Sequence, residues 1–178
     1  MRATADSSAR LTTETDADLL ALLERITGAG PLDVQAARLM VEPFAAQTAA
    51  SNATAADLAA IRDTHLAAMA ETGMELFEQL DGEFHKRIFT ATRNDLLACV
   101  HDMLKAIRAQ SAWVEIKRRS FSEARRQAYC EEHARIVAAL FARDALGAAE
   151  AMRIHLASVS RNLFGEDGSA HLVAHRLP

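Results

Sequence analysis

The clearest indication of the fold comes from residues 74–91, which read Met74-Glu-Leu-Phe-Glu-Gln-Leu-Asp-Gly-Glu-Phe-His-Lys-Arg-Ile-Phe-Thr-Ala91. Its large apolar side chains recur at every third or fourth position: Phe77, Leu80, Phe84 and Ile88. This spacing predicts an amphipathic α-helix with one apolar face. Asp81 and His85 lie one helical turn apart, within that face or at its edge. The helix therefore brings an acid and an imidazole, both able to bind a metal, toward the protein core.

Helical periodicity extends over most of the chain, and no segment alternates as a half-buried strand would. Six further helices are expected, over about residues 16–27, 32–51, 54–72, 94–117, 122–143 and 145–164. Thr54, Asn94 and Ser122 are suitable N-caps for three of them. The predicted fold class is all-α, an antiparallel bundle of about seven helices. We expect one helical domain over residues 15–165, a disordered tail or linker stub over 1–14, and an irregular C-terminal tail over 166–178.

Composition excludes several classes of function. The chain has 178 residues and a formal net charge of -4, so DNA is not an expected partner of this chain by itself. The basic run Lys117-Arg118-Arg119 is interpreted as solvated helix surface. Cys99 and Cys130 lie in apolar helical patterns and are expected to be buried free thiols, which fits a cytoplasmic setting. No apolar run approaches the ~18 residues of a membrane span.

Two other predicted helices also aim an imidazole at the core. His133 points the same way as Ile136, and His155 points the same way as Met152. Together with the acid–imidazole pair above, they make three imidazoles and one carboxylate, a suitable set of ligands for Zn²⁺ or another divalent first-row ion. Zn²⁺ is the expected ion, with Ni²⁺, Mn²⁺ and Fe²⁺ as alternatives.

Simpler interpretations of these residues stay open. A core-facing histidine is more often hydrogen-bonded than metal-bound, and the Asp81/His85 pair would also suit a surface ion pair. His65 faces the apolar side of its helix, and His101 lies at the edge of its own apolar stripe. Either could line a ligand pocket, but packing in the core or at its edge also accounts for both.

Four short motifs resemble a known family. Asp81-Gly-Glu-Phe-His85 resembles the D-x-x-F-H motif of the FCD domain, the C-terminal sensor of the FadR subfamily of GntR regulators. Residues 33–46 look like its opening helix, E-x-R-x-x-x-E-P-x-A-A. Glu132-His133-Ala-Arg-Ile136 looks like E-H-x-x-I, and residues 144–155 look like D-x-x-x-A-x-x-x-M-x-x-H-L. The motifs follow in the family's order, and the resemblance covers about residues 16–165.

The resemblance implies a bundle of six or seven helices and a homodimer. It also implies that a divalent metal is held by Asp81, His85, His133 and His155. A small organic acid would bind the open positions of this metal through its carboxylate. Arg38 matches the arginine of the opening motif and would pair with that carboxylate. Ala36 departs from the pattern, since the family usually has Glu there.

Two further residues are weaker candidates for ligand binding. Asn94 matches a recurrent asparagine and is expected mainly as a helix cap. Arg108, one turn beyond Leu104, is a further candidate for the pocket.

Three functions follow as hypotheses. The first is an effector-sensing domain of a transcription regulator, which is not an enzyme. It would reach DNA only through a winged helix-turn-helix domain, of which this sequence has no sign, so the chain is a fragment or a stand-alone sensor. The second is a metalloenzyme of the hydrolase or lyase type, with His65 or His101 as the best available base. The third is a structural helical module with satisfied core histidines.

Overall fold

The computed structural model describes the backbone of residues 4–174 and the side chains of residues 16–110 and 112–166. The described residues form helices and no strand, so the predicted all-α fold class is confirmed. The helices are α1 (Thr4–Thr27), α2 (Pro31–Asn52), α3 (Ala55–Ala70), α4 (Met74–Ala91), α5 (Asp95–Arg108), α6 (Ser111–Ser120), α7 (Glu123–Phe141) and α8 (Ala145–Ala174).

Residues up to Gly30 form one compact unit, and the residues from Pro31 on form another. The first unit contains the single helix α1, which begins at Thr4 and not near Asp16 as predicted. The described part of the predicted N-terminal tail is therefore helical. This stretch contains neither Gly nor Pro, so nothing in it ends a helix even though it lacks apolar periodicity. Residues 1–3 of that predicted tail lie outside the described residues.

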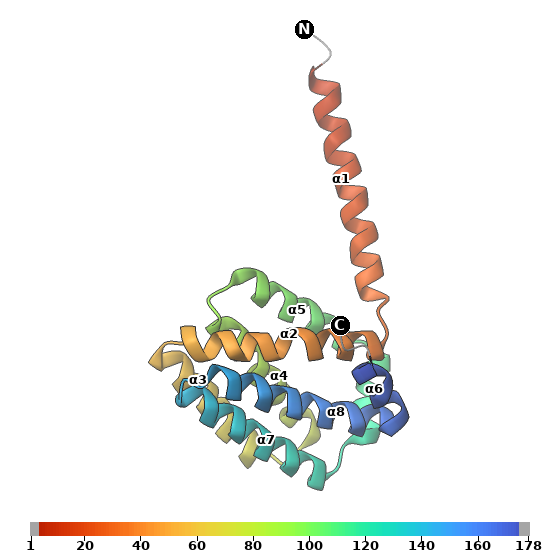
Figure 1. Cartoon of the computed structure of the whole chain (residues 1–178). Coiled ribbons are helices and arrows are strands. Elements are labelled where there is room, and N and C mark those ends of the chain that lie inside the picture. The colour runs from red at the N-terminus through yellow and green to blue at the C-terminus, as the bar shows by residue number, and fades with distance from the viewer. Residues whose placement is uncertain (1–3, 175–178) are drawn as a thin grey trace. The chain divides into compact units, whose positions relative to one another are not determined.

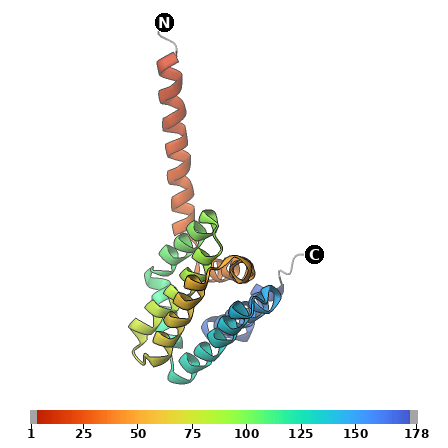
Figure 2. The ribbon, with the colours of Figure 1, turned by 90° about the vertical axis from the view of Figure 1, so that its left-hand side faces the viewer.

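In the second unit the helices pair across a shared core. In Figure 2, α3 and α4 lie on one side of the bundle and α7 and α8 on the other. The helix α2 packs mainly on α8 and also on α4, and α3 packs on α7 across the core. α5 packs against α4 and α2. This arrangement turns one face each of α2, α4, α7 and α8 toward a common interior.

Side-chain caps fix where three of these helices begin. The Thr54 hydroxyl accepts from Asp57 N, and Asp57 accepts from Thr54 N, which makes the capping box that the sequence predicts. Asn94 and Ser122 cap α5 and α7 as expected. The main apolar core joins α2, α3, α4, α7 and α8 and includes Ile61, Phe84, Ile136 and Leu156. Of the two cysteines, Cys130 is buried, but Cys99 is exposed, so the prediction that both are buried is wrong for Cys99.

The single helix predicted over residues 94–117 is wrong. The chain breaks after Arg108, and Gln110 has an extended backbone with φ -73° and ψ 153°. No Gly or Pro marks the break. The turn allows α6 to bury Trp113 and Lys117, which are 5% and 6% exposed. Burial of apolar surface therefore outweighs the local helical preference.

The buried Lys117 also corrects the interpretation of the basic run. Its Nζ lies 3.1 Å from a carboxylate oxygen of Glu78 on α4. Arg118 and Arg119 are exposed and pair with Glu115 within α6, as expected for a solvated surface. The helix surface interpretation therefore holds for the two arginines and fails for the lysine.

Gly165 ends the regular part of α8, with a φ of 73° that favours glycine. Helical structure resumes after this kink and continues to Ala174, so residues 166–174 are not irregular as predicted. Residues 175–178 lie outside the described part of the chain. Within that part, no helix combines the length and the apolar character that crossing a membrane requires.

Candidate metal centre

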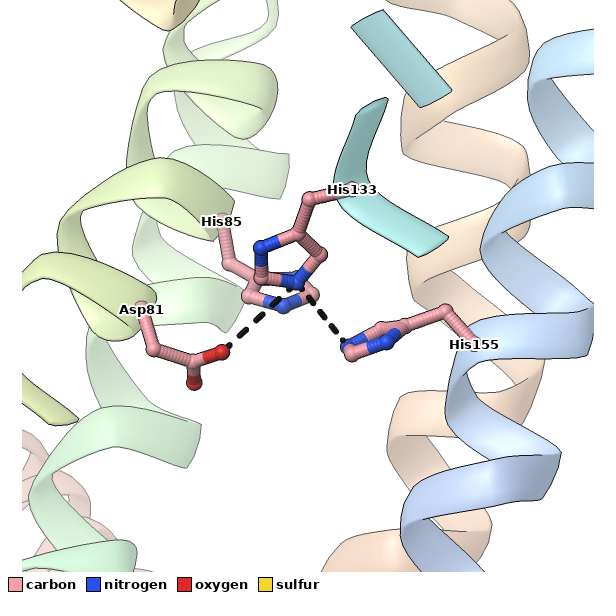
Figure 3. Close-up of side chains that lie close together, drawn as sticks. All are labelled: Asp81, His85, His133 and His155. Carbon is pink, nitrogen blue, oxygen red and sulfur yellow. Dashed lines mark hydrogen bonds and ion pairs between the residues drawn. The ribbon is translucent and has the colours of Figure 1, made fainter. Parts of the chain in front are cut away.

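α4 supplies two of the candidate ligands. Asp81 and His85 point from successive turns of this helix into the bundle, and both are buried (Figure 3). The neighbouring Phe84 and Ile88 belong to the apolar core, which anchors this face of α4. The local helical spacing therefore places an acid and an imidazole side by side inside the protein.

α7 and α8 supply the other two. His133 and His155 are fully buried, and their Nε2 atoms lie 3.2 Å apart. His133 Nε2 is also 3.6 Å from Asp81 Oδ1. One ligating atom from each of the four residues lies within 4.8 Å of the others. Figure 3 shows the four side chains converging from three helices on one point.

Carboxylates outside the cluster orient two of the imidazoles. His85 Nδ1 lies 2.7 Å from Glu42 Oε2 of α2, and His155 Nδ1 lies 2.9 Å from Glu132 Oε2 of α7. The contact with Glu132 is a hydrogen bond, whereas the contact with Glu42 is an ion pair by distance, and neither nitrogen of His85 has a protein hydrogen-bond partner. Both contacts lie at Nδ1, so Nε2 of each ring can face the centre. Metal-bound histidines are characteristically held by a carboxylate in this way.

Packing and electrostatics favour the protonation states that a metal needs. The His133 ring stacks on Phe84 with centroids 4.2 Å apart. Burial lowers the pKa of His133 and His155 well below the usual value, so both imidazoles are neutral near pH 7. Burial alone would raise the pKa of Asp81, but the pKa falls below its ordinary value, and the positive charge of Lys117 is the largest of the effects that lower it. An ionised carboxylate and neutral imidazoles are the metal-binding forms.

The spacing of the donor atoms also fits a cation. Neighbouring ligand atoms of a tetrahedral zinc with bonds of about 2.0 Å are about 3.3 Å apart. The 3.2 Å and 3.6 Å separations at His133 lie on either side of this value. A buried carboxylate among buried imidazoles costs free energy unless a positive charge compensates it. The four side chains can therefore hold a divalent metal ion.

Arg38 lies next to this centre but is already paired. Its Nε lies 2.6 Å from Glu42 Oε1, and both side chains are 1% exposed. Its Nη1 donates to Gln35 Oε1 at 3.3 Å, and Gln35 in turn donates to Ser160 of α8. The chain Arg38–Glu42–His85 thus links α2 to the centre. The role of Arg38 as partner of an effector carboxylate stays a prediction.

The two extra histidines take different positions. The ring of His65 on α3 lies 6.5 Å from that of His133, and its Nδ1 has no hydrogen-bond partner. His101 packs on Phe89 with ring centroids 5.1 Å apart, and burial lowers its pKa to about 4. Both are buried, so the core-packing interpretation accounts for them, and a role for either in ligand binding stays a prediction.

The other two candidates lie on α5. Asn94 is exposed and accepts hydrogen bonds from the backbone N–H groups of Leu96 and Leu97, so it acts as a cap. Arg108 lines a cavity between α4, α5 and α6. A contact of either residue with a ligand stays a prediction.

Three residues that influence the centre were not among those predicted from the sequence: Glu42, Glu132 and Lys117. Glu42 follows Arg38 by one helical turn, and Glu132 directly precedes His133. Both positions lie within the family motifs quoted above, and those motifs could have indicated that the two glutamates matter to the site. Lys117 carried no such signal, because its burial depends on the break between α5 and α6.

We expect Glu132→Gln to weaken metal binding by about 10–100-fold, because His155 Nδ1 loses its charged partner. Titration of the metal-free protein with Zn²⁺ against a competing chelator measures this affinity. Glu131→Gln, at the exposed neighbouring position on α7, is the matched control and should bind like the unaltered protein. Equal affinities for the two variants would show that Glu132 does not support the centre.

The protein is thus an all-α domain with a buried centre that could bind a metal. The core of its helical bundle contains the carboxylate and the three imidazoles of this centre. The chain belongs to the FCD domain family, whose model matches residues 33–158. All four motifs quoted above lie inside the matched region, and the resemblance is thereby confirmed.

The curated relatives carry the names of operon regulators. The chain is 29% identical over 157 residues to the putative L-lactate dehydrogenase operon regulatory protein of Escherichia coli strain K12, which covers 82% of this chain and 57% of that protein. It is 29% identical over 142 residues to the Uxu operon regulator of Haemophilus influenzae, covering 76% of this chain and 52% of that protein. The chain therefore spans a little over half the length of these relatives.

Proposed function

We propose that this domain senses a small organic acid on behalf of a transcription regulator, and that a divalent metal in the bundle core binds the acid's carboxylate. One observation carries the proposal: four buried side chains from three helices offer ligating atoms within 4.8 Å of one another. The names of the relatives, which are operon regulators, support the regulatory part.

Zn²⁺ is the ion that we propose first, since three imidazoles and one carboxylate suit it, and Ni²⁺, Mn²⁺ and Fe²⁺ are alternatives. When bound, the metal would supply a Lewis-acidic centre, and it could take a carboxylate oxygen as an additional ligand by expanding beyond four-coordination. Asp81, His85, His133 and His155 would hold it. Glu42 and Glu132 would orient two of the imidazoles, and the buried Arg38–Glu42 pair would keep the first of these carboxylates ionised.

Sensing requires that the acid bind two arrangements of the bundle with different affinity. The centre is suited to this because its ligands come from α4, α7 and α8, so closure around an effector acts on three helices at once. The remaining partners are also proposals: a homodimer, DNA contacted through a winged-helix domain, and a cytoplasmic location. The free thiols Cys99 and Cys130 are compatible with that location.

The test is reconstitution of the purified protein with each divalent metal, followed by elemental analysis and a thermal-shift screen of small carboxylates. We expect about one metal ion per chain and a rise in Tm with a carboxylate only when metal is present, because a ligand that binds the folded state stabilises it by mass action. Absence of bound metal would overturn the proposal. Turnover of esters, lactones or hydroxy acids in proportion to metal content would instead favour the metalloenzyme.

A further inference from the structure

Three polar side chains of α2 form a buried network beside the candidate metal centre. Gln35, Arg38 and Glu42 lie on successive turns of the helix and are 0%, 1% and 1% exposed. Arg38 Nη1 donates to Gln35 Oε1 at 3.3 Å, and Arg38 Nε donates to Glu42 Oε1 at 2.6 Å. We call these three side chains the α2 network. Buried polar groups are costly without partners, so these contacts fix where each side chain lies.

One end of the α2 network reaches the centre. Glu42 Oε2 lies 2.7 Å from Nδ1 of His85, which α4 contributes. A carboxylate at this distance can keep the imidazole turned with Nε2 toward a metal only while its own position is fixed. The ion pair with Arg38 holds Glu42 in part, but both residues belong to α2. Their pairing therefore does not by itself attach them to another helix.

The other end of the α2 network reaches α8. Gln35 Nε2 donates to the backbone oxygen of Leu156 at 3.1 Å and to Ser160 Oγ at 3.0 Å. The Ser160 hydroxyl in turn donates to the same Leu156 oxygen at 2.8 Å. A backbone carbonyl can only accept a hydrogen bond, so it determines which end of the Gln35 amide carries the N–H groups. The amide oxygen is thereby left to accept from Arg38.

The two ends of the α2 network meet different ligands of the same centre. Leu156 directly follows His155 on α8, and the rings of His155 and His85 lie 5.3 Å apart. The network thus joins the backbone beside one candidate ligand to the carboxylate that contacts the other. Each contact along it is buried and directional, so a shift of α8 would reach Glu42 through Gln35.

Resting on the proposed function, we infer that Gln35 is a positioning residue of the metal centre: it holds the Arg38–Glu42 pair against His85 and ties that pair to α8. Gln35 does not bind the metal but acts through the other two residues of the α2 network. The relative placement of His85 and His155, and with it the affinity for metal, then depends on how α2 packs on α8.

The test measures Zn²⁺ affinity by titration against a competing chelator. We expect Gln35→Met to weaken binding by about 3–10-fold, which is less than the loss of a direct partner of an imidazole would cause, because Glu42 stays but loses its anchor. Gln47→Met makes the same change at a half-buried glutamine of α2 outside the network and is the matched control. The visible absorption of the cobalt-loaded protein, which reports ligand geometry, should change only in Gln35→Met.

A second background separates positioning from a general structural role. Arg38→Met/Glu42→Leu removes the rest of the α2 network without leaving an unpaired charge. In that background Gln35→Met should alter Zn²⁺ affinity by less than about twofold, because its route to His85 is already gone. Gln35→Asn keeps the amide on a shorter side chain that cannot reach from α8 to Arg38. It should also weaken binding, and it serves if the methionine variant does not fold.

Three results would count against the inference. A lower Tm of Gln35→Met with unchanged Zn²⁺ affinity and an unchanged cobalt spectrum would make Gln35 purely structural and leave the proposed function standing. An equal loss of affinity in the two backgrounds would mean that Gln35 acts by a route other than Glu42. Failure of the unaltered protein to bind any divalent metal would overturn the proposed function and this inference together.

Discussion

The His133→Ala variant is expected to lose the stabilisation that a divalent metal gives to the unaltered protein. His133 lies 3.2 Å from His155 and 3.6 Å from Asp81, so its removal breaks the shortest contacts in the centre. Its effect on metal affinity should exceed the roughly 10–100-fold typical of outer partners. At metal concentrations of about 100 to 1,000 times Kd, the unaltered protein should gain roughly 5–15 °C in Tm, and the variant should gain almost nothing.

A control is needed because alanine also leaves a hole beside Phe84. Ile136→Ala removes another fully buried side chain of the same helix, at a cost of about 2–5 kcal/mol. This variant should melt at a lower temperature but keep the rise in Tm on metal addition. Differential scanning calorimetry with and without Zn²⁺ separates the two effects. A full metal-dependent rise in His133→Ala would show that the imidazole is core packing and not a ligand.

The second large effect is expected from Arg38→Met. This change leaves the carboxylate of Glu42, which is 1% exposed, without its cation. Breaking one side of a buried ion pair costs about 3–5 kcal/mol, which corresponds to a fall in Tm of roughly 6–20 °C. The double variant Arg38→Met/Glu42→Leu should recover much of this loss, because no unpaired charge remains. Thermal and urea unfolding of the metal-free proteins measure both.

The pH dependence has a definite sign. Burial would raise the pKa of Glu42, but Arg38 and His85 lower it well below its ordinary value of 4.5. A lowered carboxyl pKa stabilises the fold above the unfolded value, and this contribution is lost as the pH falls through the folded value. The difference between Arg38→Met and the unaltered protein should therefore be full at neutral pH and shrink below about pH 4.5.

Arg62→Met is the matched control, since Arg62 is exposed and pairs with the exposed Asp63. Its effect should stay within about 1 kcal/mol. A similarly small loss in Arg38→Met would mean that Glu42 is neutral in the fold.

Local patterns were sufficient to predict most of the helices and the four inward-facing side chains that meet in the core. The spacing of Phe77, Phe84 and Ile88 predicts α4, and the caps Thr54, Asn94 and Ser122 predict where three helices begin. The same angular count places His133 and His155 on inward faces. Both kinds of inference depend on residues within one or two turns of each other, so sequence alone carries them.

Patterns in the sequence were enough to predict an all-α fold, the inward faces of its helices and, from the order of four motifs, the family. Three features became apparent only in the tertiary structure: the break between α5 and α6, the burial of Lys117 against Glu78, and the contacts of Glu42 with both Arg38 and His85. The physical reason is that these features depend on which helices pack together. Such contacts join residues far apart in the chain, and no local period encodes them.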